Sequence, residues 1–344
     1  MKTINFAVLG CGKIGTRHAE KLNGTDYVKL VAVCDIVPER ALALSEKYVC
    51  RPYFGMDDLL KDPSVDFVNI CTPSGLHAEH TIRCLNAGKN VLCEKPMALT
   101  LKDAKRMVET AKANNKLLYV VQQNRYNPPV KLAKQLIKER KMGEPIMCIV
   151  NMLWNRDDEY YKNDSWRGTL ALDGGTIYTQ ASHFIDLMLM FMGKPKSLYS
   201  LMGTKNHSIE IEDTGVISVE FKNGSFGSVS YTTCATKKNF EGSVTLVFSR
   251  GTIKIGGEYL NTIDYFSVDG FDSYQLEETD SLANDYGTYR GSMSNHDKIF
   301  KDIIEKQNNP DKPTNLVFDE DAFQTIEFIE TALNSARTGK VVIF

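Results

Sequence analysis

The stretch Gly10-Cys11-Gly12-Lys13-Ile14-Gly15 directly follows an apolar run, residues 4–9, and opens a segment with helical spacing. Glycines at this spacing, between a strand and a helix, are typical of a turn that binds a dinucleotide. They let the backbone approach a pyrophosphate, and the helix amino terminus offers N–H groups and a positive dipole. The spacing alone is a weak signal, and a structural turn without ligand is the alternative. We expect contacts with a dinucleotide from Gly10, Gly12, Lys13 and Ile14.

Asp35 follows a second apolar run, residues 30–34. It lies about 20 residues after the last glycine, where a carboxylate binds the adenosine ribose hydroxyls and repels a 2′-phosphate. This position predicts NAD as the cofactor in preference to NADP. Arg40 leaves NADP open as an alternative, although it belongs to the next predicted helix.

The first third of the chain alternates short apolar runs with amphipathic segments, which is typical of a parallel sheet covered by helices on both faces. The sequence predicts strands over residues 4–9, 30–34, 67–71, 90–93 and 117–121. It predicts helices over residues 13–22, 38–47, 77–87 and 101–113. The fold class expected from this part is α/β, with a doubly covered sheet.

The stretch Asn90-Val91-Leu92-Cys93-Glu94-Lys95-Pro96 reads as a strand that ends at a charged pair and a proline. Proline continues neither a strand ladder nor a helix, so Lys95 is expected at the carboxyl end of the strand. Ligands of open parallel sheets bind at that edge, which makes Lys95 a candidate for catalysis. A solvated loop lysine is the alternative.

The turn Thr72-Pro73-Ser74-Gly75-Leu76-His77 follows another predicted strand at the same edge. We expect the nicotinamide half of the cofactor to lie near Thr72, Pro73, Ser74 and His77. His77, His80 and Cys84 share one face of the predicted helix, which raises the alternative of a metal site. No further ligand stands at a recognisable spacing, so the sequence predicts no bound metal.

Length and composition restrict the class of protein. A chain of 344 residues exceeds one hydrophobic core, and we expect a cofactor domain over residues 1–124 and a second domain over residues 125–344. The 41 basic and 43 acidic residues nearly balance, which argues against nucleic acid or an anionic membrane as a partner. The eight scattered cysteines suit reduced thiols in the cytoplasm. The longest apolar run, residues 184–192, is shorter than the roughly 20 residues of a membrane span.

A helix is predicted from Thr176, after two glycines, and Thr179, His183 and Asp186 then lie on one face at three- and four-residue spacing. A lone histidine on a half-apolar helix is often a core residue. Before this helix stands Trp166-Arg167-Gly168-Thr169, and the segments on either side alternate like strands. His183 is therefore a candidate site residue that the spacing alone does not establish.

Taken together, the glycine turn, Thr-Pro-x-x-x-His, Glu-Lys-Pro and Gly-Gly-x7-His-x2-Asp resemble the Gfo/Idh/MocA oxidoreductases over essentially the whole chain. The resemblance implies a Rossmann domain followed by an α/β domain with a large open, mainly antiparallel sheet. It places Lys95 in the active site and His183 at the substrate hydroxyl. It also adds Glu94, Lys95 and Gln123 to the expected cofactor contacts. Thr179 departs from the inositol dehydrogenases, which carry an aspartate there. The proton path must then run through Lys95, His183 or solvent.

Three further stretches are similar to one branch of that family, the UDP-N-acetylglucosaminuronate 3-dehydrogenases of bacterial surface-sugar synthesis. They are residues 123–127, 166–169 and 237–242. The similarity implies a sugar-nucleotide substrate, hydride transfer from ring carbon 3 to NAD, and 2-oxoglutarate as a possible acceptor for recycling NADH. We expect the substrate to contact Lys95, Asn124, Arg125, Trp166, Arg167, Thr179, Gln180, His183 and Lys238.

The open sheet predicts a homodimer or homotetramer, because its uncovered face must be buried. Two other functions remain possible from the sequence. One is oxidation of a free cyclitol, hexose or glycoside. The other is a non-catalytic regulator that binds NAD or a sugar nucleotide.

Overall fold

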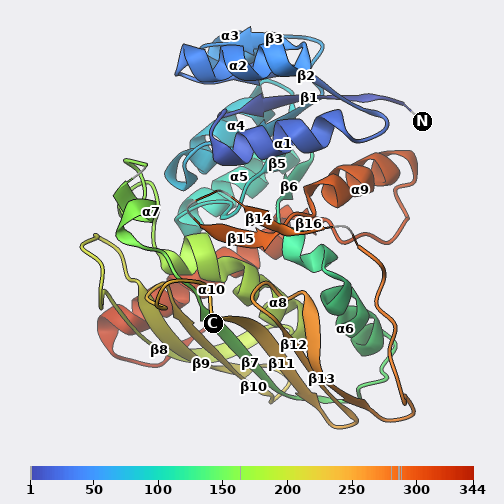
Figure 1. Ribbon diagram of the computed structural model, residues 1–344, viewed down its shortest axis with the longest axis vertical. Helices are drawn as coiled ribbons and strands as arrows, with labels where there is room; N and C mark the ends of the chain where they lie inside the picture. The colour runs from blue at the N-terminus through green and yellow to red at the C-terminus, as the bar shows by residue number, and fades with distance from the viewer. Residues whose placement is uncertain (1, 163, 280, 286, 288) are drawn as a thin grey trace. The chain divides into compact units, whose positions relative to one another are not determined.

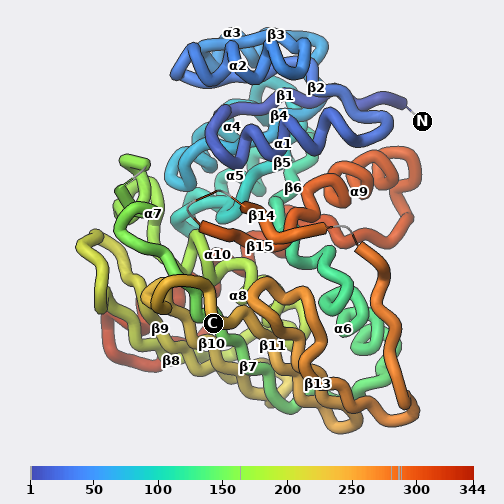
Figure 2. The backbone as a smooth tube through the Cα atoms, in the orientation of Figure 1, coloured from blue at the N-terminus to red at the C-terminus, as the bar shows by residue number. Residues whose placement is uncertain are grey.

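The computed structural model describes residues 2–162, 164–279, 281–285, 287 and 289–344. The chain forms two compact units, one of Met1–Gln122 with His296–Ile326 and one of Gln123–Asn295 with Glu327–Phe344. This division differs from the two consecutive segments expected from the sequence, residues 1–124 and 125–344, because the chain returns to the first unit near its end. There α9 (His296–Asn308) packs against α1 (Lys13–Asn23), as Figure 2 shows in red and blue.

The first unit is built on a seven-stranded sheet of order β16-β6-β5-β4-β1-β2-β3. Its strands are β1 (Ile4–Leu9), β2 (Val28–Cys34), β3 (Arg51–Tyr53), β4 (Phe67–Ile70), β5 (Asn90–Cys93), β6 (Leu118–Val120) and β16 (Val317–Phe318). All neighbours pair in parallel except β16, which is antiparallel to β6. The five predicted strands are present. The prediction lacked β3 and β16, because two or three residues carry no periodic pattern.

Helices cover this sheet and thereby bury its central strands on both faces. They are α1, α2 (Pro38–Tyr48), α3 (Met56–Leu60), η1 (Ser74–Leu76), α4 (His77–Asn86), α5 (Leu101–Ala113), α9 and the first part of α10 (Asp319–Thr338). Helix α1 packs on β1 and β2, and α4 packs on β4 and β5. The ring of Phe6 lies 5.1 Å from that of Phe67 and 5.6 Å from that of Phe300, which ties α9 to the sheet.

The second unit contains an eight-stranded sheet of order β13-β12-β11-β7-β10-β9-β8-β17. Its strands are β7 (Pro145–Leu153), β8 (Pro195–Gly203), β9 (Thr214–Phe221), β10 (Phe226–Thr232), β11 (Glu241–Phe248), β12 (Gly251–Gly256), β13 (Thr262–Val268) and β17 (Val342–Ile343). Only β7 and β10 pair in parallel. The expected mainly antiparallel sheet is therefore confirmed, and β9 and β10 form a hairpin whose turn contains Asn223 and Gly224.

Helices of the second unit lie along one side of this sheet (Figure 1). They are η2 (Gln123–Tyr126), α6 (Pro128–Lys138), α7 (Asp158–Lys162), η3 (Ile177–Ala181), α8 (Ser182–Met192) and the rest of α10. After β13, the short strand β14 (Ala283–Asp285) pairs with β15 (Arg290–Met293). Among the described residues, no helix has the length and apolar character that a bilayer span requires.

Candidate active site

The glycine turn between β1 and α1 has the shape expected of a dinucleotide turn. Gly10 has a φ of +96°, and a Cβ there would stand 2.8 Å from the backbone of Cys71. A Cβ on Gly15 would lie 1.8 Å from the carbonyl oxygen of Gly10. By contrast, a Cβ on Gly12 would meet nothing within 4 Å, and no side chain caps α1 at this residue. The amino end of α1 therefore has room and N–H groups for a pyrophosphate.

Asp35 lies directly after β2 and is held by backbone N–H groups. Its Oδ2 accepts a 2.7 Å hydrogen bond from the Cys11 N–H, and its Oδ1 accepts one of 2.8 Å from the Val37 N–H. A carboxylate has about four lone-pair sites, so two of them remain for ribose hydroxyls. This arrangement fits the predicted contact with NAD.

Lys95 is partly buried, immediately after β5, and its peptide bond to Pro96 is cis. Its backbone N–H donates to Oε2 of the buried Glu94 at 3.1 Å. The turn thus begins at the end of a buried parallel strand, as the sequence predicts. The strand end and the Glu94 carboxylate together position the backbone of Lys95.

His77 joins the two turns that follow β4 and β5. Its Nδ1 lies 2.7 Å from the Pro96 carbonyl oxygen, and its Nε2 lies 2.8 Å from the Thr72 carbonyl oxygen. The ring is 1% exposed, and burial lowers its pKa although both carbonyls act in the opposite direction. These contacts favour a role in holding the Lys95-Pro96 turn. Contact between His77 and the cofactor stays a prediction.

Glu94 belongs to a buried cluster with His18 and His296. His18 Nε2 lies 2.8 Å from Glu94 Oε1, and the Asn69 amide nitrogen lies 3.2 Å from His18 Nδ1, which assigns the proton to Nε2. His296 Nε2 lies 3.5 Å from the same carboxylate oxygen. Burial acts to raise the pKa of Glu94, but the contacts with His18 and His296 hold it well below its usual range.

Two histidines and a carboxylate are a donor set that binds divalent transition metals. Their ligand atoms lie within 4.8 Å of one another. However, the His18–Glu94 hydrogen bond already occupies the atoms that would face such an ion. We therefore assign this cluster a structural role beside Lys95, and the absence of a resident metal stays a prediction.

In the second unit, His183 lies in the first turn of α8 and is 3% exposed. The predicted helix is present, but it begins with η3, a π-helical turn. Such turns are frequent at functional sites, and they change the angular step between Thr179 and His183 from that of a regular α-helix. The Thr179 hydroxyl donates to the Gly175 carbonyl oxygen at 3.1 Å.

Arg125 forms a bidentate ion pair with Asp186 of α8. Its Nε and Nη2 donate to the two carboxylate oxygens at 2.8 and 2.7 Å, and both residues are buried. The charge predicted to meet the substrate is thus neutralised within the chain. A substrate contact by Arg125 stays a prediction, whereas the ion pair itself anchors η2 to the helix that carries His183.

Arg167 and Gln180 meet in a cluster that also contains Arg156, a residue absent from our sequence-based site. Arg156 Nη2 donates to the Gln180 side-chain oxygen at 2.9 Å, and the Gln180 amide nitrogen donates to the Tyr160 hydroxyl at 3.0 Å. Arg167 lies 4.1 Å from the Tyr160 ring centroid and 4.8 Å from that of Trp166. The available signal was an arginine just beyond an apolar strand, and it is too common to single out one residue.

The remaining predicted residues are placed less specifically. Gln123 and Asn124 are buried in η2, and each has a side-chain oxygen with no hydrogen-bond partner in the described part of the chain. Lys238 is 81% exposed, with Glu258 at 3.9 Å as its ion-pair partner. Contacts of these residues with cofactor or substrate stay predictions.

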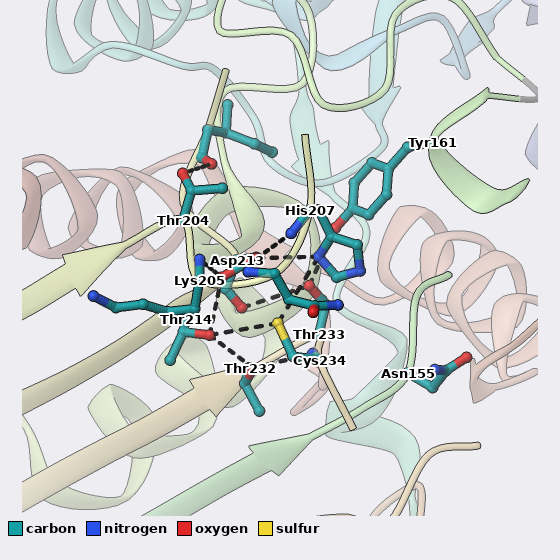
Figure 3. Close-up of polar contacts among 12 residues, drawn as sticks. Asn155, Tyr161, Thr204, Lys205, His207, Asp213, Thr214, Thr232, Thr233 and Cys234 are labelled. Carbon is teal, nitrogen blue, oxygen red and sulfur yellow. Dashed lines mark hydrogen bonds and ion pairs between the residues drawn. The ribbon is translucent and has the colours of Figure 1, made fainter. Parts of the chain in front are cut away.

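A second cluster of possible metal ligands contains His207 and Asp213, from the segment between β8 and β9, and Cys234, which follows β10 (Figure 3). His207 Nδ1 stands 3.1 Å from Asp213 Oδ2 and 3.8 Å from Cys234 Sγ. The Asp213 carboxylate also accepts the N–H groups of Lys205, Asn206 and His207 and the hydroxyl of Thr214. A metal would have to break these bonds. Burial and the neighbouring Asp213 raise the pKa of Cys234, so the cluster is no activated thiol either.

The described geometry defines a class of protein, an NAD-dependent dehydrogenase with a Rossmann unit and a mainly antiparallel second unit. Family models agree with it. Residues 4–122 match the model "Oxidoreductase family, NAD-binding Rossmann fold", and residues 130–254 match the "GFO/IDH/MocA C-terminal domain". The chain belongs to the Gfo/Idh/MocA family of oxidoreductases.

Known relatives show the same family over the full length. The WlbA dehydrogenase from Bordetella pertussis, solved with NADH and UDP-GlcNAcA, is 31% identical with a TM-score of 0.89 and coverage of 100% and 99% of the two chains. WlbA from Chromobacterium violaceum, with the same two ligands, is 32% identical with a TM-score of 0.87 and coverage of 100% and 96%. A myo-inositol 2-dehydrogenase of Thermotoga maritima is 30% identical over 66% of this chain and 67% of its own length. The chain is thus an NAD-dependent sugar dehydrogenase.

Proposed function

We propose that this enzyme oxidises ring carbon 3 of UDP-N-acetylglucosaminuronate, UDP-GlcNAcA, with NAD. The supporting observation is the full-length likeness, at 31% and 32% identity, to two dehydrogenases solved with NADH and this sugar nucleotide. The product would enter the synthesis of a bacterial surface sugar. Recycling of NADH by 2-oxoglutarate belongs to the same proposal.

A second candidate is oxidation of a free cyclitol, supported by the myo-inositol 2-dehydrogenase relative. Its substrate is neutral, and a site for it needs hydroxyl-matching amides and carboxylates. Converging cations would be costly there, because a buried charge without a partner is unfavourable. The second unit carries Arg156 and Arg167 around shared aromatic rings, which favours an anionic sugar.

The cofactor would be held by the glycine turn and by Asp35, and when bound it accepts the hydride from the sugar carbon. Lys95 is the group we propose to take the hydroxyl proton and to stabilise the developing alkoxide. His183 is proposed as a second group that binds this hydroxyl. Thr179 cannot act as a base, and its hydroxyl already donates to Gly175. The proton therefore leaves through Lys95, His183 or solvent.

Kinetics on three compounds tests the substrate. We expect higher kcat/KM on UDP-GlcNAcA than on UDP-N-acetylglucosamine or myo-inositol, measured with 2-oxoglutarate present to recycle any bound NADH. Higher efficiency on myo-inositol, or indifference to the uronate carboxylate, would defeat the proposal and leave the dehydrogenase assignment intact.

Replacing Lys95 tests the mechanism. Lys95→Ala should lower turnover by about 10²-fold or more while NAD affinity changes far less, because general-base catalysis is worth about that much. The exposed Lys102 offers a matched control, and Lys102→Ala should leave turnover near the wild-type value. Near-normal turnover of Lys95→Ala would return Lys95 to a structural role.

We also propose that the enzyme is a homodimer or homotetramer joined through the open sheet. The strand register puts Leu201 opposite Val216, and Phe226 opposite Met147, on one face. These side chains are 61%, 48%, 56% and 39% exposed, which is unusual for neighbouring apolar residues on one sheet face. A second copy of the chain would cover them. Light scattering that shows a monomer at micromolar concentration would contradict this proposal.

A further inference from the structure

Arg156 is placed just beyond the end of β7. Its backbone N–H donates to the Thr233 carbonyl oxygen at 2.9 Å, after Trp154 has made the same contact with Thr232 at 3.0 Å. The strand pairing of β7 with β10 thus continues to Arg156 and fixes its backbone. The residue is 1% exposed and is among the largest fully buried side chains of the described chain.

The guanidinium group of Arg156 has only neutral partners. Nη1 donates to the carbonyl oxygen of Asn155 at 2.6 Å and to Asn239 Oδ1 at 3.2 Å, and Nη2 donates to Gln180 Oε1 at 2.9 Å. Its Nε is buried and has no acceptor among the described residues. No described carboxylate lies within ion-pair distance of this cation, although arginine cannot release its proton.

Aromatic rings offset part of this cost. The Arg156 guanidinium carbon lies 4.9 Å from the Tyr289 ring centroid and 5.3 Å from that of Tyr160. Arg167 uses the same two rings, at 5.5 and 4.1 Å. A desolvated cation–π contact is worth about 2 kcal/mol, less than the several kcal/mol that burying a charge costs. The remaining cost of burying the Arg156 charge favours the binding of an additional anion.

The two arginines differ in how their charge is paired. Arg167 Nε donates to Asp164 at 2.8 Å, whereas Arg156 Nε has no acceptor among the described residues. The buried Asp173 adds a second negative charge, which acts on Tyr160 together with both arginines, but its Oδ2 accepts the Gly168 N–H. A carboxylate, with one negative charge, suits this partly compensated cluster better than a diphosphate, which carries more charge. Arg167, Gln180 and Tyr289 are only partly buried, so the cluster has a side that a ligand can reach.

We propose that Arg156 and Arg167 form the subsite that selects the uronate carboxylate, an inference that rests on the proposed function. Arg167 and Gln180 touch the carboxylate. Arg156 is a positioning residue behind them, which orients Gln180 and supplies the positive charge. Substrates that lack the carboxylate leave this charge unmatched and bind less tightly.

The test supplies Arg156 with an internal counterion. Gln180→Glu and Asn239→Asp each convert an oxygen already bonded to Arg156 into a carboxylate oxygen of nearly the same shape, so neither opens a cavity. The Kd values of UDP-GlcNAcA, UDP-N-acetylglucosamine and UDP are measured by calorimetry on the NADH complex. Hydrogen bonds to charged groups are worth about 1.5–3 kcal/mol, so we expect the preference for the uronate to fall about 10- to 100-fold.

One control variant and three contradicting outcomes complete the test. Arg156→Lys keeps the charge and should retain most of the preference. Equal weakening of the uronate and the neutral sugar, in both neutralising variants, would overturn the subsite and assign the cluster to folding. Weakened binding of UDP itself would overturn the carboxylate assignment in favour of the diphosphate. Wild-type enzyme that binds no UDP-GlcNAcA would instead overturn the proposed function, and the subsite with it.

Discussion

Two arginines of the second unit, Arg125 and Arg156, are both buried and yet differ in how their charge is balanced. Arg125 meets both oxygens of Asp186 within the chain. Arg156 meets amide and carbonyl oxygens and the faces of aromatic rings. The first arrangement is complete without a ligand. The second is stabilised further when an anion arrives.

An arginine within a recognised sequence motif is therefore not necessarily the arginine that is available to a substrate. Arg125 stands in a stretch similar to sugar-nucleotide dehydrogenases and was expected at the substrate. Its ion pair to the helix of His183 indicates a structural use of the charge. Arg156 belongs to no recognised motif of the sequence, and its buried charge, without an ion pair in the described chain, indicates a ligand.

Breaking the ion pair between Arg125 and Asp186 should have the largest effect on stability. Arg125→Met leaves the Asp186 carboxylate buried without its cation, which typically costs about 3–5 kcal/mol of unfolding free energy. Arg156→Met leaves no orphaned charge and should cost clearly less. Urea denaturation measures both. Replacing Arg125 and Asp186 together by apolar residues should restore part of the loss, and equal losses in the two single variants would contradict the comparison.

Glu212 extends the comparison to a group that can lose its charge. A buried carboxyl group without a cation becomes neutral by keeping its proton, which an arginine cannot do. It accepts the Ile177 N–H at 2.7 Å at the start of η3, and burial raises its pKa to about 7 from 4.5. The native state then binds a proton that the unfolded state releases between these pH values. Stability should fall as pH rises through this window, by up to about 3 kcal/mol.

Glu212→Gln tests this directly, since the amide imitates the protonated carboxyl. Its unfolding free energy should lose the slope that the wild type shows between pH 4.5 and pH 7. Denaturation curves at several pH values give the comparison. An unchanged slope in the variant would assign the pH dependence to other groups.

Arg167 is intermediate between Arg125 and Arg156, because its partner Asp164 has a side chain that is 30% exposed. Arg167→Met should raise KM for UDP-GlcNAcA about tenfold, the loss of one charge-assisted hydrogen bond, and leave NAD binding unchanged. Lys162→Met, at an exposed cation on α7, is the matched control and should change neither. Weakened NAD binding in Arg167→Met would argue for a general structural defect.

Asp35 represents a third way of holding a buried charge, through backbone N–H groups. Asp35→Ala removes the acceptor proposed for the ribose and the repulsion of a 2′-phosphate. We expect the preference for NAD over NADP to shrink by several-fold, the smallest effect in this series. Fluorescence titration of both cofactors measures it. Tighter binding of NADP than of NAD by the wild type would refute the assigned role of Asp35.

Much of the first unit could be predicted because its signals are local. The glycines at 10 and 15 are required by backbone approaches that admit no Cβ, and Lys95 is placed by a strand end and a proline. The approach of Gly15 to Gly10 and the end of β5 at Lys95 fall within a few residues of the chain, whereas Gly10 approaches Cys71 of a distant turn. The return of His296–Ile326 to this unit could not be predicted, because β16 is two residues long and its pairing with β6 spans nearly 200 residues of sequence.

The Rossmann unit, NAD as the cofactor and the family can be read from the sequence, because they depend on short motifs with fixed spacing. Which buried charges are matched becomes visible only in the folded chain. Arg125 forms an ion pair with Asp186, 61 residues further along the chain. Arg156 donates a hydrogen bond to Asn239, 83 residues further along, but forms no ion pair with a described carboxylate. Charge balance in a buried site is a property of all neighbours in space, and spacing along the chain carries no record of it.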